Sequence, residues 1–219
     1  LRANPVQVSY RDGSTGEELT ETMTADHVAG LVRMYAYMPA VGALLPQLIH
    51  EASQGRYANL MALAKMMQSD MAESMSMGMQ MSVICTEDAD SMVVRAEDAD
   101  TVLGNRMVEG MAAMCEAWPK GDKPADFNTA LKGDLPMLVL TGEFDPVTPP
   151  KYGEEIAKGL PNARWLDLKG QGHNVIGVGC MPKLFAQFIE KADAKALDAK
   201  CLDTLAYAPP FTSYNGWEP

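Results

Sequence analysis

The sequence predicts an α/β protein in which a long helical block precedes a strand–helix–strand–helix segment. Apolar residues recur at helical spacing through residues 20–119, whereas short apolar runs alternate with helical segments after residue 132. Such alternation is typical of a parallel sheet covered by helices on both faces, with functional residues on loops beyond the carboxyl ends of the strands. We therefore expect three parts: residues 1–19, 20–131 and 132–219.

Residues 1–19 are predicted to form one core strand and a turn. Apolar and polar residues alternate over residues 6–10, and residues 12–16 combine Asp, Ser, Thr and two glycines, as turns do. The first residues contain neither a Met nor a targeting segment. We therefore expect the chain to be a piece of a longer polypeptide.

The helical block is expected to contain several helices and to end in a linker. Helical patterns begin at Thr24, at Leu44 and near Tyr57, and further helical material continues to Cys115. Pro39 ends the first pattern, because proline cannot donate the backbone hydrogen bond that would continue the helix. Residues 120–134 are rich in Lys, Asp, Gly and Pro, as linkers are.

A methionine cluster marks the third helical pattern. Flexible thioethers suit an adaptable apolar surface, either a lid packed on a core or the wall of a pocket for varied apolar groups. A Cu(I) site in an oxidising compartment is the alternative, because thioether is a soft ligand. We predict no metal and no cofactor. The cluster comprises Met61, Met66, Met67, Met71, Met75, Met77, Met79 and Met81.

Asp145 and His173 follow the two strands predicted at residues 135–141 and 164–168. The loops after neighbouring parallel strands meet at one edge of a sheet, so a carboxylate and an imidazole placed there can form a hydrogen bond. A nucleophilic hydrolase needs an imidazole to take the hydroxyl proton and a carboxylate to hold that imidazole. The pattern predicts the acid and the base of a catalytic triad.

The cysteines form an even set without a C-x-x-C pair, which argues against zinc and redox motifs. Pairing of Cys85 with Cys115 and of Cys180 with Cys201 is geometrically plausible among three connectivities, because the second pair brackets one helix. Disulfides would place the protein in an oxidising compartment. The alternative is four buried free thiols in a cytosolic protein.

The net charge disfavours two classes of partner. The formal charge of −11 disfavours nucleic acid and anionic membrane surfaces. No apolar run reaches the roughly 18 residues that a bilayer-spanning helix needs. We therefore predict neither a nucleic-acid partner nor a membrane partner, and a neutral or cationic ligand.

Four stretches of the sequence belong together: LPMLVLTGEFDPVTPPKY at residues 135–152, Gly170–His173 with Cys180 after it, Ile84–Asp88, and Cys115–Pro119. They resemble the tripeptidyl-aminopeptidase-like branch of the α/β-hydrolases, which are relatives of proline iminopeptidase. The resemblance covers nearly the whole chain and implies the carboxyl-terminal portion of an α/β-hydrolase fold, with residues 20–131 as an inserted helical lid and residues 132–219 as the end of the core. It further implies that Asp145 and His173 complete a triad with a serine, and that the cysteines pair.

The resemblance implies a periplasmic or secreted aminopeptidase that releases short peptides or residues from peptide amino ends. Glu87 and Asp88 lie where such a protein recognises the free amino terminus of its peptide substrate. The chemistry agrees, because an ammonium in a partly dry pocket needs a carboxylate counter-charge. The alternative for both residues is a solvated acidic turn.

The nucleophile motif of the family, G-x-S-x-G, does not occur in these 219 residues. Ser14 is the near miss, but Asp12 stands where the strained turn needs a small residue. We therefore expect the nucleophile and the oxyanion hole in a missing amino-terminal part of the hydrolase core, and an inactive chain on its own. The alternatives are a non-catalytic module that binds peptides or a partner protein, and an α/β-hydrolase of esterase type.

Overall fold

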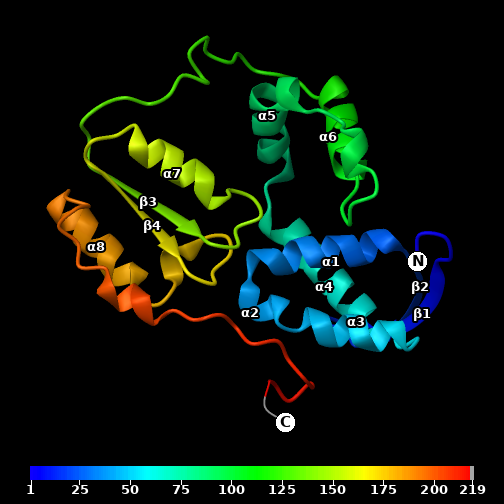
Figure 1. The fold of residues 1–219 in the computed structure, drawn as a ribbon. Helices are drawn as coiled ribbons and strands as arrows, with labels where there is room; N and C mark the ends of the chain where they lie inside the picture. Colours follow the sequence, from blue (N-terminus) through cyan, green and yellow to red (C-terminus); the bar gives the residue numbers. More distant parts are fainter. Residues whose placement is uncertain (218–219) are drawn as a thin grey trace. The chain divides into compact units, whose positions relative to one another are not determined.

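The computed structural model describes residues 1–217, apart from the side chains at positions 70–72 and 74. Contacts divide the chain into two compact units (Figure 1). Unit 1 comprises Leu1–Leu31 and Gln54–Asn128, and unit 2 comprises Val32–Ser53 and Thr129–Pro219. Residues 32–53 thus group with the carboxyl-terminal segment, although the sequence suggested one continuous helical block. The use of that block as a lid stays a prediction.

Unit 1 begins with an antiparallel hairpin of β1 (Val6–Arg11) and β2 (Glu18–Met23). The second strand was not predicted, because its alternation is carried largely by polar residues. Its threonines nevertheless bond across the hairpin: Ser9 and Thr20 share a hydrogen bond of 2.8 Å between their hydroxyls. The start of the chain is therefore a hairpin rather than one strand with a loop.

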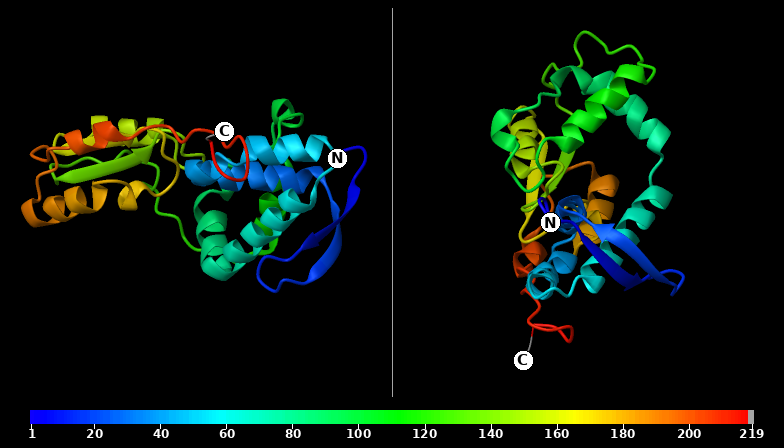
Figure 2. Two further views of the ribbon diagram at one scale, coloured as in Figure 1. Left: turned by 90° about the horizontal axis from the view of Figure 1, so that it is seen from below. Right: turned by 90° about the vertical axis from the view of Figure 1, so that its right-hand side faces the viewer.

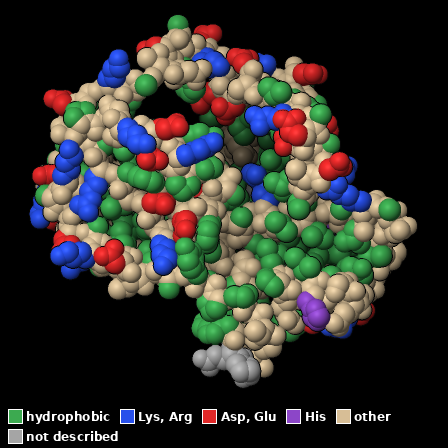
Figure 3. Space-filling model, viewed as in Figure 1, with side chains coloured by type: hydrophobic (Ala, Val, Ile, Leu, Met, Phe, Trp, Pro, Cys, Tyr) green, Lys and Arg blue, Asp and Glu red, His purple; other side chains and the backbone are tan. Residues whose placement is uncertain are grey.

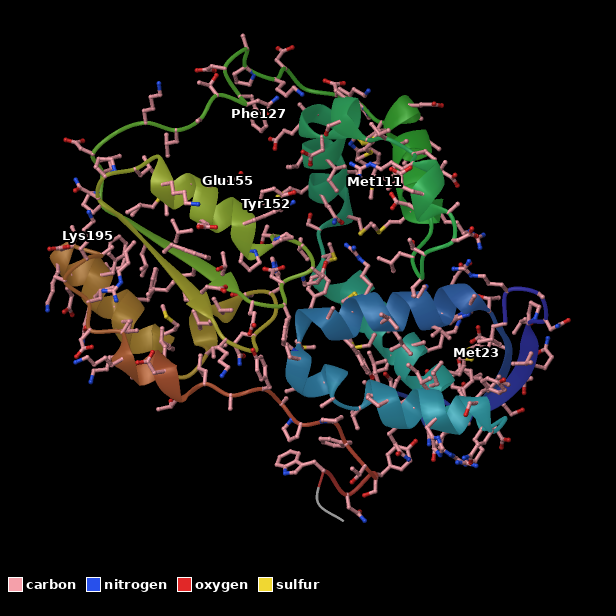
Figure 4. The ribbon with its side chains drawn as sticks, in the orientation of Figure 1. Met23, Met111, Phe127, Tyr152, Glu155 and Lys195 are labelled. Carbon is pink, nitrogen blue, oxygen red and sulfur yellow. A yellow bond between two sulfur atoms is a disulfide. The ribbon has the colours of Figure 1, made fainter. Side chains whose placement is uncertain are left out.

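The helices of unit 1 are the first part of α1 (Ala25–Tyr37), then α4 (Ala58–Ser74), α5 (Met77–Glu87) and α6 (Arg106–Ala117). A disulfide joins α5 to α6 and is buried with Met81, while Met111 packs against it (Figure 4). The helical material expected to continue to Cys115 is interrupted at residues 92–105. That stretch holds only one short 3₁₀ turn, at Ala96–Asp98, and Gly104 adopts a positive φ of 58°.

The methionine cluster is divided between the interior and the surface. Met61 and Met81 are buried, whereas Met66, Met77 and Met79 are exposed. The side chain of Met71 lies outside the described residues. A shared apolar function for the whole cluster therefore stays a prediction. Among the described residues, no group of three His, Cys, Asp or Glu could hold a metal ion.

Unit 2 is built on the parallel pair β3 (Met137–Gly142) and β4 (Ala163–Leu168), in register from Met137 opposite Ala163 to Gly142 opposite Leu168. The helix α7 (Pro150–Lys158) makes the crossover between them. Because the strands are parallel and in register, the loops that follow them leave the same edge of the sheet. Strands and crossover agree with the predicted α/β segment.

Helices cover both faces of this sheet (Figure 2). The face with Thr141 and Trp165 packs against α7 at Gly153, where a Cβ would lie 3.3 Å from the indole nitrogen of Trp165. Tyr152 and Glu155 are exposed on α7 (Figure 4). The opposite face packs on α8 (Met181–Lys191). Its core consists of Leu138, Leu140, Leu166, Leu168, Val175, Met181, Leu184 and Leu197.

The remaining elements of unit 2 are α2 (Pro39–Gly42), α3 (Leu45–Ser53), and two 3₁₀ turns, η3 (Val175–Gly177) and η4 (Lys200–Thr204). A tail of residues 205–217 follows η4. Its Phe211 donates a backbone hydrogen bond of 2.8 Å to the carbonyl of Ala43. The hydroxyl of Tyr214 donates one of 2.5 Å to the carboxylate of Glu51. The tail is thereby fixed to α3 and to Ala43, the residue that follows α2.

On the face drawn in Figure 3, side chains of both charge signs are interspersed over the part that holds α7 and α8. No helix among the described residues has the length and the apolar character needed to cross a bilayer.

Candidate functional site

Asp145 is held by a turn that follows β3. In the run Asp145-Pro146-Val147-Thr148, the carboxylate oxygen Oδ1 accepts the N–H groups of Val147 at 2.8 Å and of Thr148 at 3.0 Å. The hydroxyl of Thr148 donates to Oδ2 at 2.8 Å. Asp is suited to this turn, because its short side chain reaches the backbone two and three residues on. The carboxylate is therefore oriented before any other residue contacts it.

His173 completes a pair with this carboxylate. Its Nδ1 lies 2.9 Å from Oδ2 of Asp145, whose side chain is only 4% exposed. The backbone N–H of His173 donates to the carbonyl of Tyr37 at 2.9 Å. The Tyr37 ring lies edge-on to the imidazole, with 5.4 Å between the ring centroids. The imidazole is thus fixed from two sides, while 37% of its side-chain surface stays open.

Two glycines allow close backbone approach around this pair. A Cβ at Gly142 would lie 2.7 Å from the carbonyl oxygen of Gln171, in the loop that carries His173. A Cβ at Gly172 would lie 2.7 Å from the carbonyl oxygen of Ala36, in α1. Real Cβ atoms do not come so close to backbone atoms, so each position requires glycine.

The environment keeps Asp145 ionised. Burial raises the pKa of its carboxyl, but the hydrogen bonds from the N–H groups of Thr148 and Val147, from His173 and from the Thr148 hydroxyl outweigh burial and hold the pKa below its ordinary value of 3.8. An ionised carboxylate only accepts hydrogen bonds, so the shared proton sits on Nδ1 of His173. The lone pair of the imidazole is then on Nε2, as a general base requires.

A cavity of about 360 Å³ adjoins the pair. Asp145, Thr148 and His173 line it, and Asn174, at a positive φ of 62°, continues its wall. The cavity leaves room beside the imidazole for the group whose proton it would take. The geometry can therefore perform the acid and base parts of a nucleophilic hydrolysis.

Glu87 and Asp88 lie in unit 1, at the carboxyl end of α5. An ammonium already binds at this helix end: Nζ of Lys123 donates to the carbonyl of Glu87 at 3.2 Å and lies 3.1 Å from a carboxylate oxygen of Asp90. A helix carboxyl end favours cations, because its last carbonyls carry partial negative charge. Recognition of a substrate amine by Glu87 and Asp88 stays a prediction.

All four cysteines are paired, in the connectivity considered plausible from the sequence. Cys85 bonds to Cys115 in unit 1, and Cys180 bonds to Cys201 in unit 2. Cys180 directly precedes α8, and Cys201 lies in η4. The second disulfide therefore joins the start of α8, which packs on the sheet, to η4.

Ser14 lies in the exposed turn of the β1–β2 hairpin, where its N–H donates to Oδ1 of Asp12 at 3.0 Å. The turn joins two antiparallel strands, whereas a nucleophile needs a sharp strand-to-helix turn. The hairpin thus gives a second reason against Ser14 as nucleophile.

Sequence reasoning missed two partners of the pair, Thr148 and Tyr37, and one residue that joins its loops, Glu143. Thr148 could have been found, since Thr three residues after Asp is the signature of the turn. Tyr37 could not, because its contact comes from a distant helix. Glu143 gave no signal beyond its place next to the acid, although its carboxylate accepts the N–H of Gly170 at 2.8 Å.

Residues 100–201 match a family model described as TAP-like protein, one of the α/β-hydrolase families. The matched segment contains β3, α7, β4 and α8, together with Asp145 and His173. No curated protein and no solved structure gives a significant match to the chain.

Proposed function

We propose, from the match of residues 100–201 to the TAP-like family of α/β-hydrolases, that the chain supplies the acid and the base of a serine aminopeptidase. The observation that carries the proposal is the hydrogen bond of 2.9 Å between His173 and the buried carboxylate of Asp145. Substrates would be peptides with a free amino terminus, from which short peptides or single residues are released.

In this mechanism His173 removes the proton of a serine hydroxyl through Nε2 while the oxygen attacks the scissile carbonyl. The imidazole becomes positively charged, and Asp145 stabilises that charge because its carboxylate is ionised and 2.9 Å from Nδ1. His173 then returns the proton to the leaving amine. Asp145 keeps the imidazole of His173 in the correct tautomer, since Thr148 and the turn backbone fix the orientation of the carboxylate.

The nucleophilic serine and the oxyanion hole would come from a segment outside these 219 residues, because the sequence contains no G-x-S-x-G. This amino-terminal part of the core is the first partner that we propose. Residues 20–131 would then act as a lid over the assembled site. The chain by itself would bind peptides but would not hydrolyse them.

The acidic end of α5 would bind the substrate amine. Glu87 is our first choice, since the same helix end already binds the ammonium of Lys123 through the Glu87 carbonyl. The two disulfides are compatible with an oxidising compartment, and we propose that the protein is periplasmic or secreted.

A fluorophosphonate probe tests the reaction class. We expect it to label a serine outside these residues in the intact protein and to leave this chain unlabelled. The H173Q variant of the intact protein should lose most of the labelling, because the hydroxyl then lacks its base. Labelling of Ser14 would contradict the assignment, as would full labelling of H173Q.

Calorimetric titration tests the choice of substrate. We expect a short peptide with a free amine to bind more tightly than the same peptide acetylated, and E87Q to remove most of that difference. E109Q offers the matched control, because it makes the same change at an exposed glutamate of α6.

The absence of G-x-S-x-G favours one second candidate, a non-catalytic module that binds peptides or a partner protein. Tight peptide binding by this chain, in a protein whose intact form reacts with no probe, would support that candidate.

A further inference from the structure

Glu143 joins three segments of unit 2: the acid loop (residues 143–149), the base loop (residues 169–174) and the tail. It directly follows β3 and lies two positions before Asp145. Its Oε2 accepts the backbone N–H of Gly170 at 2.8 Å. Its Oε1 accepts the hydroxyl of Tyr207, in the tail, at 3.0 Å. A single carboxylate therefore binds a donor from each of the other two segments.

The tail packs on both loops around this carboxylate. The ring of Tyr207 stacks on Phe144, with 5.7 Å between centroids and 25° between the planes. The ammonium of Lys169 lies 4.9 Å from the centroid of the same ring. The hydrogen bond to Glu143 also raises the pKa of the Tyr207 phenol. Tyr207 thus holds the carboxylate from the tail side while touching both loops.

Gly170 is shaped for this junction. Its φ is +69°, and a Cβ there would lie 3.1 Å from the carbonyl oxygen of Ala206. A side chain would push the tail away from the base loop, and with it the Tyr207 hydroxyl. Gly170 therefore brings both an N–H group and the tail to one carboxylate.

We propose that Glu143 is a positioning residue, whose carboxylate fixes the spacing between the acid and base loops and thereby keeps His173 within hydrogen-bond reach of Asp145. The inference rests on the proposed function, since positioning matters for catalysis only if this pair is the acid and base. Gly170 precedes His173 by three positions, so a shift of the base loop at Gly170 moves the imidazole. Asp145 is fixed by its own turn. The base loop is held at Gln171 by the N–H of Phe144 at 2.8 Å and at His173 by the carbonyl of Tyr37, and the Glu143 carboxylate adds the bond at Gly170.

The test is proton NMR of this chain labelled with ¹⁵N-histidine. The Nδ1 proton of His173 should give a low-field signal, assigned by its loss in H173Q. His27 does not interfere, because its Nδ1 accepts the N–H of Thr24 at 3.1 Å. In E143A we expect this proton to exchange with water at least about tenfold faster, because the variant loses both hydrogen bonds to the charged carboxylate, from Gly170 and from Tyr207. E143Q and Y207F should show smaller increases, because each loses part of the clamp.

E155A is the matched control, because it removes an exposed glutamate from α7. It should leave the His173 signal unchanged. A folded E143A with an unchanged exchange rate would overturn the proposal. If E143A does not fold, unchanged rates in both E143Q and Y207F would overturn it instead. The exchange measurement needs no turnover. The absence of a reactive serine in the intact protein would therefore contradict the proposed function, while the exchange rates would still test the role of Glu143.

Discussion

Asp12 in unit 1 and Asp145 in unit 2 begin the same turn, Asp-x-x-Thr, in different surroundings. Each carboxylate accepts the N–H groups two and three residues on, and each accepts the hydroxyl of the threonine that ends the turn, Thr15 or Thr148. Both carboxyls have a lowered pKa, Asp12 because of its bonds to Thr15 above all. The local sequence is therefore sufficient for the turn.

The difference lies in what the rest of the unit adds. Asp12 stands in an exposed hairpin turn, whereas the side chain of Asp145 is 4% exposed and its Oδ2 also receives the imidazole of His173. The turn orients a carboxylate, and burial between two strand ends gives it a base to hold. A turn motif alone is thus no evidence of a catalytic acid.

Removal of each carboxylate should give the largest difference in stability between the two turns. D145A leaves two N–H groups, the Thr148 hydroxyl and the imidazole without their acceptor, and we expect a loss of about 3 kcal/mol in the free energy of unfolding. D12A should cost clearly less, because water can replace its carboxylate. Guanidinium unfolding followed by circular dichroism measures both. Equal losses would mean that burial adds nothing to the turn.

Acid should remove the stability that the ionised carboxylate of Asp145 contributes. Because the pKa of Asp145 is lowered on folding, its ionised form stabilises the protein above the ordinary value of 3.8, and this contribution disappears as the pH falls through the lowered value. The difference in unfolding free energy between wild type and D145N should therefore be constant near neutral pH and shrink below about pH 4. Thermal melts from pH 6 to pH 2 give the profile. A difference that grows with acid would contradict the lowered pKa.

The threonines should give the smallest contrast. T148A removes one hydroxyl from Oδ2 of Asp145, and we expect a loss of about 1 kcal/mol. T148S keeps the hydroxyl and serves as its control, so it should stay close to wild type. T15A makes the same change in the exposed turn and should cost less than T148A. Equal stabilities of T148A and T148S, again from guanidinium unfolding, would show that the hydroxyl bond is not stabilising.

The sequence predicted the elements that carry the acid and the base, because buried strands and amphipathic helices leave clear periodicities. It also predicted that Asp145 and His173 meet, since loops after parallel neighbours share one edge. It could not predict Tyr37 as a partner of His173, because that contact depends on where residues 32–53 pack. The strand at residues 18–23 was missed for another reason: its cross-strand bonds are made by polar residues, which hide the apolar alternation.

The indole contacts give each unit its own optical reporter. In unit 1, Trp118 packs against the Cys85–Cys115 disulfide, and disulfides quench the emission of a touching indole. In unit 2, the indole N–H of Trp165 donates to the hydroxyl of Thr141 at 2.8 Å, between sheet and α7. Fluorescence can therefore follow reduction in one unit and loss of sheet packing in the other, once Trp217 in the tail and the tryptophan of the other unit are replaced by phenylalanine.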